Sequence, residues 1–450
     1  MANTAVYRTL SQNYGTGGGI TTISFWFKRA RTGTNEVLTS SYYSGSFYGQ
    51  FQLGSNDKLT IQDWRNTNVY SKTTNMVFRD TSAWYHVCWS FNNRTGGSSS
   101  SNLWINGELI TSWSSETEYS YQATTSWNTD YTHYIGCLNT SSSQAYFSGL
   151  IADYYFIQGQ AYNVSLFGET DSTTGEWKPK TNPTIDYSGT GNNSCHLKFE
   201  NSGNMDLDSG SNNLTFTTSG AGVTQTQDNP SNIFCAMDPL YNQSVGQGMT
   251  FTNSGTRTGY DPNSSRTAIG SMAVNKGKFY YECKMEATGG KAVVGFVDVY
   301  NWTDINQASG FAFQDFSTGI GYNTEDGNTI TNNTGTSYGN TYAQDDIIGC
   351  AFDLDNGKIY FSKNGTWQNS GDPTSGSTGT GAANFTPASD GLYAPAARHR
   401  NGTYIQWNFG NGYFRTTAIS SAGTNASNLG TFEYDVPNGY TALCTKGLNE

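Results

Sequence analysis

Short runs of apolar and aromatic residues alternate with polar loops along the first third of the chain. The runs occupy residues 20–28, 36–39, 47–53, 58–63, 84–91, 103–110, 131–138 and 149–158. Runs of this length and spacing are typical of the strands of a β-sandwich. Within one run, the pair Asn106-Gly107 can adopt the positive φ angles that a two-residue hairpin turn requires. The pattern therefore predicts antiparallel strands connected by tight turns.

The composition extends this prediction to the whole chain. Of the 450 residues, 52 are glycine and 14% are aromatic, whereas only 13% are charged. Gly, Asn, Ser and Thr destabilise helix interiors, and aromatic residues are favoured in strands. A single hydrophobic core rarely exceeds about 300 residues, so we expect more than one domain. The sequence predicts an all-β chain of two antiparallel β-sandwiches at residues 1–165 and 231–450, joined by an irregular connector at 166–230.

The charges and apolar runs argue against several classes of protein. The net charge is −11 and the 24 Lys and Arg residues are scattered, which disfavours binding to nucleic acid or to an anionic membrane surface. No apolar run approaches the roughly 18 residues of a membrane span, so we expect no membrane insertion. The opening residues lack the apolar core of a secretory signal peptide, which predicts synthesis in a cytoplasm. The seven cysteines lie far apart, mostly in strand-like runs, and are expected to be small buried hydrophobic residues.

Four short motifs in the first third occur in the order and spacing of the laminin G or concanavalin A-like jelly roll, which the segment resembles. They are Ser-Phe-Trp-Phe-Lys at 24–28, Trp-Tyr-His-Val at 84–87, Leu-Trp-Ile-Asn-Gly at 103–107 and Gly-Leu-Ile-Ala-Asp at 149–153. In many members of that family, a strand similar to Leu-Lys-Phe-Glu at 197–200 precedes the first strand, whereas here it follows the last one. The resemblance implies that residues 195–217 form a permuted strand that completes the first sandwich.

From Met237 onward, the chain resembles the SPRY domain. The motifs occur in family order and cover nearly all of residues 237–445; they lie at 278–283, 293–296, 345–365, 392–396 and 407–410. The turn pairs Asn356-Gly357 and Asn364-Gly365 independently predict two hairpins around the strand-like run between them. The resemblance implies a second β-sandwich.

We find no arrangement of residues typical of catalysis, and we expect no catalytic residues. Glu282 and Glu286 resemble part of the Glu-x-Asp-x-Glu signature of sandwich-fold glucanases, but Lys284 replaces the middle acid. On an ideal strand their Cα atoms would lie roughly 13 Å apart, whereas the carboxyl groups of a retaining glycosidase lie about 5–5.5 Å apart. A solvated strand face is the simpler interpretation of both glutamates.

The sequence also contains no clear motif for a metal or a cofactor, and we expect neither. The four histidines lack the spacing of transition-metal sites, and His86 lies in an aromatic strand, where a packed histidine is the expected role. Calcium remains one open alternative, because laminin G relatives sometimes hold this ion at the rim of the sandwich. Asp63, Asp130 and Asp153 lie near predicted strand ends and are the candidate ligands.

Aromatic residues in polar loops are the best candidates for ligand binding. Sugars present C–H faces that stack on Tyr and Trp rings, and their hydroxyl groups suit Asn, Asp, Ser and backbone amides. The candidate binding residues are Tyr42, Tyr43, Trp64 and Trp127 in the first sandwich, and Trp302 and Tyr338 in the second.

The combination of the two domains is similar to fibre and adhesin proteins of tailed bacteriophages, which share the low charge and the richness in Gly, Asn, Ser, Thr and Tyr. This resemblance implies a non-enzymatic virion surface protein, of a capsid or tail fibre, that binds a host-surface ligand, foremost a glycan. Other virion structural proteins are then further partners. The resemblance also implies a homo-oligomer, with a trimer as one form, although the sequence contains no heptad run.

Two other classes of function remain open. A concanavalin-fold hydrolase that degrades glycans would need the carboxylate pair that the sequence lacks. An intracellular SPRY adaptor that binds a peptide is the other alternative, for which a laminin G-like partner domain is unusual.

Overall fold

The computed structural model describes most of the chain. The described residues are 4–11, 19–94, 96–141, 145–172, 174–220, 223–240, 249–260, 265–288, 291–300, 313 and 319–449. They form strands connected by turns and short 3-10 helices, with 47% strand and 5% helix. The predicted all-β fold class is therefore confirmed. Within these ranges, no helix is long and apolar enough to cross a membrane.

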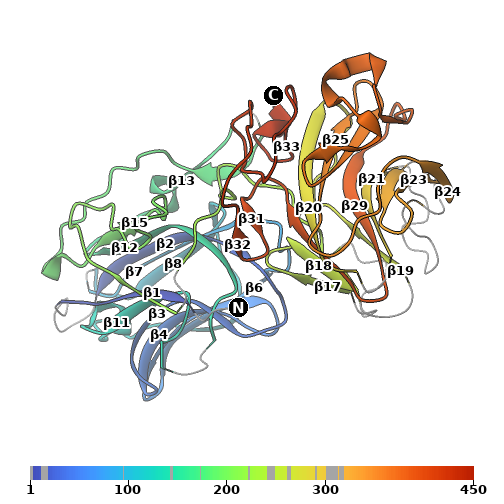
Figure 1. Cartoon of the computed structure of the whole chain (residues 1–450). Coiled ribbons are helices and arrows are strands. Elements are labelled where there is room, and N and C mark those ends of the chain that lie inside the picture. Colours follow the sequence, from blue (N-terminus) through green and yellow to red (C-terminus); the bar gives the residue numbers. More distant parts are fainter. Residues whose placement is uncertain are drawn as a thin grey trace. The chain divides into compact units, whose positions relative to one another are not determined.

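The chain divides into two compact units (Figure 1). The first unit comprises Met1–Gln225 and the second comprises Thr226–Glu450. Each unit has its own hydrophobic core between two large sheets, which confirms the two predicted sandwiches. The division falls a few residues before the expected start of the second sandwich at residue 231.

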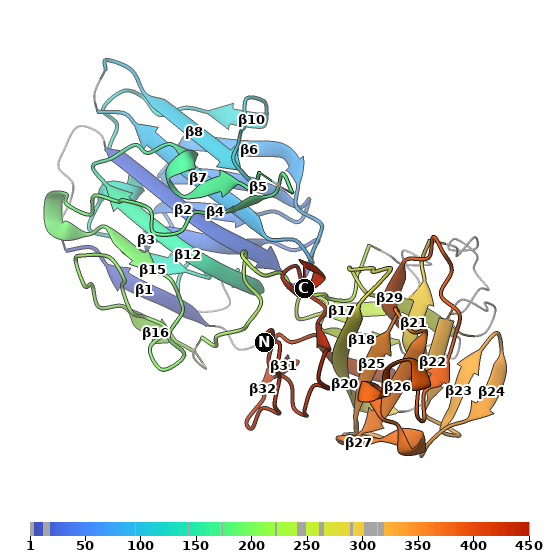
Figure 2. The same ribbon diagram turned by 90° about the horizontal axis from the view of Figure 1, so that it is seen from above.

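The first unit is a sandwich of two antiparallel sheets (Figure 2). The eight-stranded sheet has the order β10-β6-β5-β4-β3-β11-β1-β16. Its strands are β1 (Ala5–Thr9), β3 (Glu36–Ser44), β4 (Phe47–Leu53), β5 (Lys58–Arg65), β6 (Asn68–Val77), β10 (Trp113–Thr117), β11 (Thr132–Ile135) and β16 (Thr217–Ser219). The six-stranded sheet has the order β15-β12-β2-β7-β8-β9. Its strands are β2 (Ile20–Arg29), β7 (Tyr85–Asn92), β8 (Ser100–Ile105), β9 (Glu108–Leu109), β12 (Gly149–Gln158) and β15 (Cys195–Leu197).

Residues beyond 165 also belong to the first unit and extend both of its sheets. The segment 195–217 begins with β15, which pairs with β12, and ends at β16, which pairs with β1. Before it, the hairpin of β13 (Gly168–Thr170) and β14 (Trp177–Pro179) lies near the outer face of the six-stranded sheet. There, Phe167 packs on Tyr155 with ring centroids 5.0 Å apart, and Trp177 belongs to the same apolar cluster.

The second unit is likewise built from two large sheets. The first of these has the order β17-β18-β30-β20-β25-β26-β27, and the second has the order β19-β29-β21-β22-β23-β24. The first contains β17 (Met249–Thr252), β18 (Arg257–Tyr260), β20 (Lys278–Thr288), β25 (Ile347–Asp353), β26 (Lys358–Lys363), β27 (Thr366–Trp367) and β30 (Thr403–Asn408). The second contains β19 (Ser265–Ile269), β21 (Ala292–Asp298), β22 (Gly319–Asn323), β23 (Asn328–Thr331), β24 (Thr334–Ser337) and β29 (Tyr393–Arg400). The two predicted turns join β25 to β26 and β26 to β27, so both hairpins are confirmed.

All seven cysteines are buried and none forms a disulfide, which confirms their expected packing role. Cys283 and Cys350 lie on the paired strands β20 and β25 in the core of the second unit. Burial raises the pKa of both thiols. They therefore stay protonated at neutral pH and behave as small apolar side chains.

Trp127 belongs to the core of the first unit, which corrects its expected role as a ligand-binding residue in a loop. It lies in the 3-10 turn η1 (Ser126–Asn128) and is fully buried. Its ring packs against Phe51 and Trp89, with ring centroids 5.4 and 6.0 Å apart. Gly49 in β4 leaves room for this ring, because a Cβ atom there would lie 2.7 Å from the indole. The polar turn thus carries a core side chain.

Gly49→Ala is expected to destabilise the first unit by about 1–3 kcal/mol, because the added methyl group overpacks the aromatic core around Trp127. Gly45→Ala is the matched control in the neighbouring turn, since no atom lies within 4 Å of the added Cβ. It should change the free energy of unfolding by less than about 0.5 kcal/mol. Urea denaturation followed by tryptophan fluorescence measures both changes, and equal stabilities of the two variants would contradict this packing.

Candidate functional site

Three aromatic residues form a row across neighbouring strands of the eight-stranded sheet. Tyr42 in β3 is paired with Tyr48 in β4, and Tyr48 is paired with Trp64 in β5. Residues directly opposite each other on paired strands share one face of the sheet. The adjoining residues Gly49 and Asp63 face the core, so the three rings lie on the outer face. The Tyr42 and Tyr48 rings stack with centroids 6.5 Å apart, and all three rings are half-buried.

A second aromatic group, which includes one arginine, lies at the ends of the same strands. Tyr43, Phe47 and Arg65 each adjoin a residue of the row in sequence, and Tyr131 directly precedes β11. Tyr43 is 69% exposed, and its ring stacks on Tyr131 with centroids 5.2 Å apart. The guanidinium carbon of Arg65 lies 5.5 Å from the ring centroid of Phe47 and 5.9 Å from that of Tyr131.

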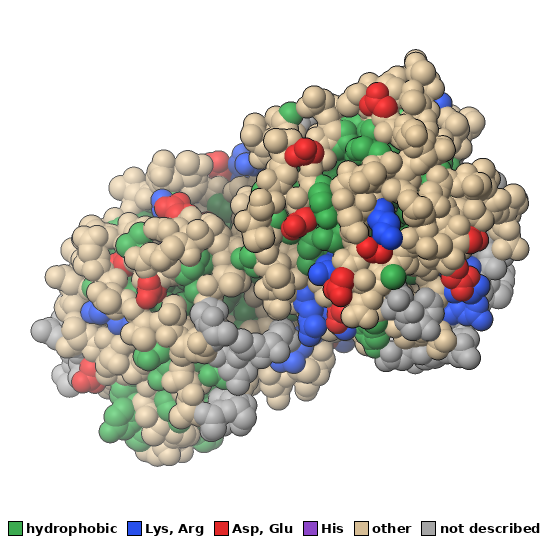
Figure 3. Space-filling view, viewed as in Figure 1, with side chains coloured by type: hydrophobic (Ala, Val, Ile, Leu, Met, Phe, Trp, Pro, Cys, Tyr) green, Lys and Arg blue, Asp and Glu red, His purple; other side chains and the backbone are tan. Residues whose placement is uncertain are grey.

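We call these two groups together the aromatic tip. Its members are Tyr42, Tyr43, Phe47, Tyr48, Trp64, Arg65 and Tyr131. Figure 3 shows hydrophobic side chains gathered at the lower end of the first unit, over the region where Figure 1 places β3 and β4. Aromatic residues gathered at one end of a sandwich suit binding better than single exposed rings do, so the tip is the candidate functional site.

A backbone hydrogen bond connects the two turns that carry the tip. The Asn66 amide donates to the Ser46 carbonyl with 2.7 Å between nitrogen and oxygen, which links the β5–β6 turn to the β3–β4 turn. Asn66 has a φ of 58°, a left-handed conformation that Asn tolerates better than most residues. The ring of Tyr43 and the guanidinium of Arg65 therefore start from backbones that are fixed to each other.

Asp63 in β5 holds in place the segment that leads to Tyr131. Its carboxylate is fully buried and accepts hydrogen bonds from the Ser126 amide at 2.8 Å, the Ser126 hydroxyl at 2.6 Å and the Tyr119 hydroxyl at 2.8 Å. Burial raises the pKa of Asp63, and these donors oppose the rise. The bonds hold the 3-10 turn η1 against β5, and the chain continues from this turn to Tyr131.

The three aspartates of the calcium alternative do not gather in one place. The oxygens of Asp63 are engaged by protein donors, and Asp153 lies in an irregularity of β12, with its carboxylate 3.2 Å from the His196 ring nitrogen. In the described ranges, no group of three His, Cys, Asp or Glu residues could hold a metal ion. The structure thus gives Asp63 and Asp153 structural roles.

The structure brings together three of the six predicted binding residues: Tyr42, Tyr43 and Trp64. The prediction for Tyr338 is wrong, because this residue is buried in the core of the second unit. Its hydroxyl accepts the backbone amide of Phe361 in β26 at 3.1 Å. Trp302 lies outside the described residues.

Sequence analysis did not single out Arg65 and Tyr131 as binding residues. Arg65 could have been found from the register of the β4–β5 hairpin, because it is paired with Phe47. No local signal identifies Tyr131, which meets Tyr43 only through the pairing of the distant strands β11 and β3.

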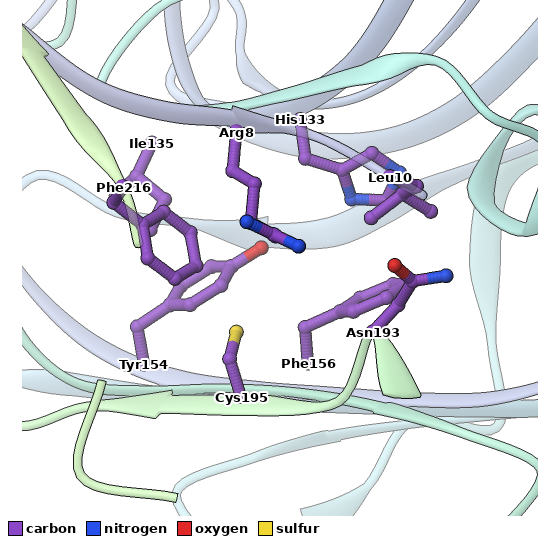
Figure 4. Close-up of a pocket in the computed structure, with 9 residues that line it drawn as sticks. All are labelled: Arg8, Leu10, His133, Ile135, Tyr154, Phe156, Asn193, Cys195 and Phe216. Atoms are coloured by element: carbon purple, nitrogen blue, oxygen red, sulfur yellow. The ribbon is translucent and has the colours of Figure 1, made fainter. Parts of the chain in front are cut away.

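A small cavity between the two sheets of the first unit is not a second candidate for sugar binding (Figure 4). Its volume is about 10 Å³, about the space that one water molecule needs. Arg8 and His133 line it from β1 and β11, and Tyr154 and Cys195 line it from the other sheet. A sugar ring is much larger than this space.

A buried serine and histidine in the first unit resemble part of a catalytic site but have the wrong proton arrangement. The hydroxyl of Ser24 lies 2.8 Å from Nε2 of His86, and the Trp177 indole N–H donates to Nδ1 of His86 at 3.0 Å. Nδ1 must therefore be the acceptor and Nε2 must carry the proton. Nε2 then donates to Ser24 and cannot take its proton. His86 is a fully buried packing residue, as predicted, and burial lowers its pKa to about 3.

Two family models match the chain. The model described as "Concanavalin A-like lectin/glucanases superfamily" matches residues 3–161, and the model described as "SPRY domain" matches residues 278–411. The chain contains a concanavalin-like domain and a SPRY domain. The aromatic tip lies entirely within the concanavalin-like domain. No curated protein matches the chain.

Solved structures similar to the chain include other SPRY domains. The SPRY domain of human HERC1 is 18% identical with a TM-score of 0.30, and the match covers 38% of this chain and 96% of that one. A human SPRY domain is 19% identical with a TM-score of 0.27, and the match covers 36% of this chain and 96% of that one. Stonustoxin is 12% identical with a TM-score of 0.28, covering 39% of this chain and 27% of that one. A similarity at this level gives no information about what the present chain binds.

Glu282 of the SPRY domain is fully buried, which corrects the expected solvated strand face. Its carboxylate accepts the backbone amides of Glu433 and Tyr434, each at 2.8 Å. It also accepts the Tyr280 hydroxyl at 3.1 Å and the Asn408 side-chain amide at 3.2 Å. Burial raises the pKa of Glu282 to about 7, against the effect of these four donors. The carboxylate thus fastens the C-terminal segment to β20.

Glu286 has different partners from Glu282. It forms ion pairs with Arg257 at 2.6 Å and with Arg415 at 3.3 Å. The hydrogen bond from Arg257 holds the pKa of Glu286 below its ordinary value. The two glutamates therefore serve as separate structural contacts and do not act as a carboxylate pair.

The stability of the SPRY domain should depend on pH through Glu282. The pKa of Glu282 is about 7 in the folded state, above the ordinary 4.5. Its contribution to the free energy of unfolding is therefore full below about pH 4.5 and is lost as the pH rises to about 7. The loss should be on the order of 3 kcal/mol. Glu282→Gln does not titrate and should lack this change, whereas Glu433→Gln should keep it. Urea denaturation across this pH range measures the difference, and parallel profiles for wild type and Glu282→Gln would contradict it.

Proposed function

We propose that this protein is a non-enzymatic surface protein of a bacteriophage virion that binds host-surface glycans through the aromatic tip. The tip is the observation that carries the proposal. The exposed ring of Tyr43, stacked on Tyr131 at the ends of the strands that carry three more rings, offers a flat face on which the C–H surface of a sugar can pack. Both domains of the chain are of types that suggest binding.

The polar residues beside the aromatic row suit a neutral, hydroxyl-rich ligand. Gln50, Gln52 and Gln62 lie on the same strands as Tyr48 and Trp64, at alternate positions and thus on the same face. The Gln50 amide donates to the oxygen of Gln62 at 3.2 Å. Amide groups offer both donors and acceptors to sugar hydroxyls.

The environments of the candidate catalytic residues support a binding role without catalysis. Glu282, the acid with a pKa near neutrality, is fully buried and is surrounded by four donors. The Ser24 and His86 contact has the proton on the wrong nitrogen. A glycan hydrolase would have to use other residues.

The virion location rests on the resemblance of the domain combination and composition to phage fibre and adhesin proteins. The proposal includes synthesis in the host cytoplasm, contact with other virion proteins and a homo-oligomer, for which a trimer is one form. Repetition of a weak site on one particle raises the overall affinity for a cell surface. Mass spectrometry of purified particles tests the location: detection of the chain supports it, and its absence from the particles overturns it.

Tyr43→Ala and Trp64→Ala should each weaken glycan binding about tenfold or more. Truncation of a ring that stacks on a ligand typically costs about 1–3 kcal/mol. Tyr300→Ala is the matched control, because Tyr300 is also highly exposed, at 62%, but lies in the second unit. Glycan-array and cell-binding measurements on the isolated protein avoid the masking effect of multivalency.

Three results would overturn parts of this proposal. Absence of any glycan binding by the wild type would leave a purely architectural role. An equal loss of glycan binding in Tyr300→Ala would show that the tip is not the specific binding site. Release of reducing sugar during the assay would show that the protein is an enzyme.

A further inference from the structure

We propose that the aromatic tip selects anionic sugars and that Arg65 binds the acidic group, an inference that rests on the proposed glycan binding. The ligand class is a sugar with a carboxylate or sulfate substituent. The inference follows from the contacts of Arg65, the one cation of the tip.

Arg65 has no acidic partner among the described residues, unlike Arg29, Arg31 and Arg79 of the same unit. Arg29 and Arg79 form ion pairs with Asp57 at 2.9 and 3.0 Å, and Arg31 forms one with Glu36 at 2.7 Å. In the described part of the chain, no carboxylate lies within ion-pair distance of Arg65, and its buried Nη1 atom has no hydrogen-bond partner. In a chain with a net charge of −11, an arginine at the surface without such a partner is unexpected.

Aromatic rings hold the guanidinium of Arg65 in place. The rings of Phe47 and Tyr131 lie 5.5 and 5.9 Å from its central carbon, within the range of cation–π contacts. These contacts restrict the side chain without using its N–H donors. The guanidinium thus makes no hydrogen bond within the described part of the chain, and its solvent-facing donors can meet an oxyanion from outside the protein.

The acidic side chain closest to Arg65 in sequence has another role. Asp63 lies two positions before Arg65 in β5, and its buried carboxylate accepts three hydrogen bonds from Ser126 and Tyr119. Arg65 lowers the pKa of Asp63 only as a minor contributor. Among the described residues of the first unit, no ion pair neutralises the positive charge of Arg65.

The position of Arg65 suits recognition of an acidic substituent on a stacked sugar. Tyr131 contacts both the guanidinium of Arg65 and the exposed Tyr43 ring. A sugar that stacks on these rings brings its substituents to the edge of the same group of side chains. The planar guanidinium can then donate two parallel hydrogen bonds to a carboxylate or sulfate.

The test is a glycan array in which each acidic glycan is printed beside its carboxyl-reduced or desulfated form. We expect the isolated full-length protein to bind acidic members at least tenfold more tightly than their neutral partners, and to lose this preference as salt is raised. Arg65→Gln should abolish the preference, with a larger loss of affinity for the acidic members than for their neutral partners. Arg65→Lys should retain part of it, because the charge remains but the planar fork is lost.

Arg94→Gln is the matched control, because it removes the same charge from another exposed position of the first unit. It should leave the preference intact. The responses of carboxylated and sulfated pairs distinguish the two sources of negative charge.

The outcomes separate this inference from the proposed function. Equal binding of acidic and neutral partners by the wild type would overturn the role of Arg65 and leave glycan binding intact. Absence of binding to every glycan would overturn both. An equal loss of acidic and neutral binding in a folded Arg65→Gln variant would show that Arg65 only positions the rings, which also overturns the inference.

Discussion

The register of the β3, β4 and β5 hairpins is the constraint on which the candidate site depends. Direct pairing of Tyr42 with Tyr48 and of Tyr48 with Trp64 places three rings on one face of the sheet. A slip of one residue in either hairpin would turn one set of rings into the core. The same register places Phe47 opposite Arg65 at the strand ends. Binding chemistry at the tip is therefore a consequence of sheet geometry.

The core of the first unit enforces this register. Leu59 and Ile61 in β5, like Phe51 and Leu53 in β4, are fully buried, so their strands cannot shift without exposing them. Asp63 adds a polar constraint on the same face, because its carboxylate must keep its donors from Ser126 and Tyr119. Leaving a buried carboxylate without donors would cost several kcal/mol. The exposed rings thus rest on a scaffold that packing and buried hydrogen bonds hold together.

Sequence analysis predicted features that local chemistry determines. The hairpins at Asn356-Gly357 and Asn364-Gly365 follow from turn residues alone, and the burial of His86 follows from its aromatic strand. The all-β class follows from a composition that disfavours helices.

The failures concern residues whose environment depends on distant strands. Trp127 and Tyr338 have the polar neighbours of ligand-binding aromatics, yet both are buried in cores formed by segments far away in sequence. The sequence around Glu282 has the pattern of a solvent-exposed strand face, but the C-terminal segment covers this side chain. Tyr131 reaches the tip only through strand pairing with β3.

The central claim is that the aromatic tip is the ligand-contacting surface. Hydrogen–deuterium exchange of the full chain, with and without the tightest-binding glycan of an array, tests this most directly. The account predicts slower exchange on glycan addition in the β3–β4 turn, in the β5–β6 turn and around Tyr131, and unchanged exchange in the second unit. Slower exchange confined to the second unit, with no change in either turn, would contradict it.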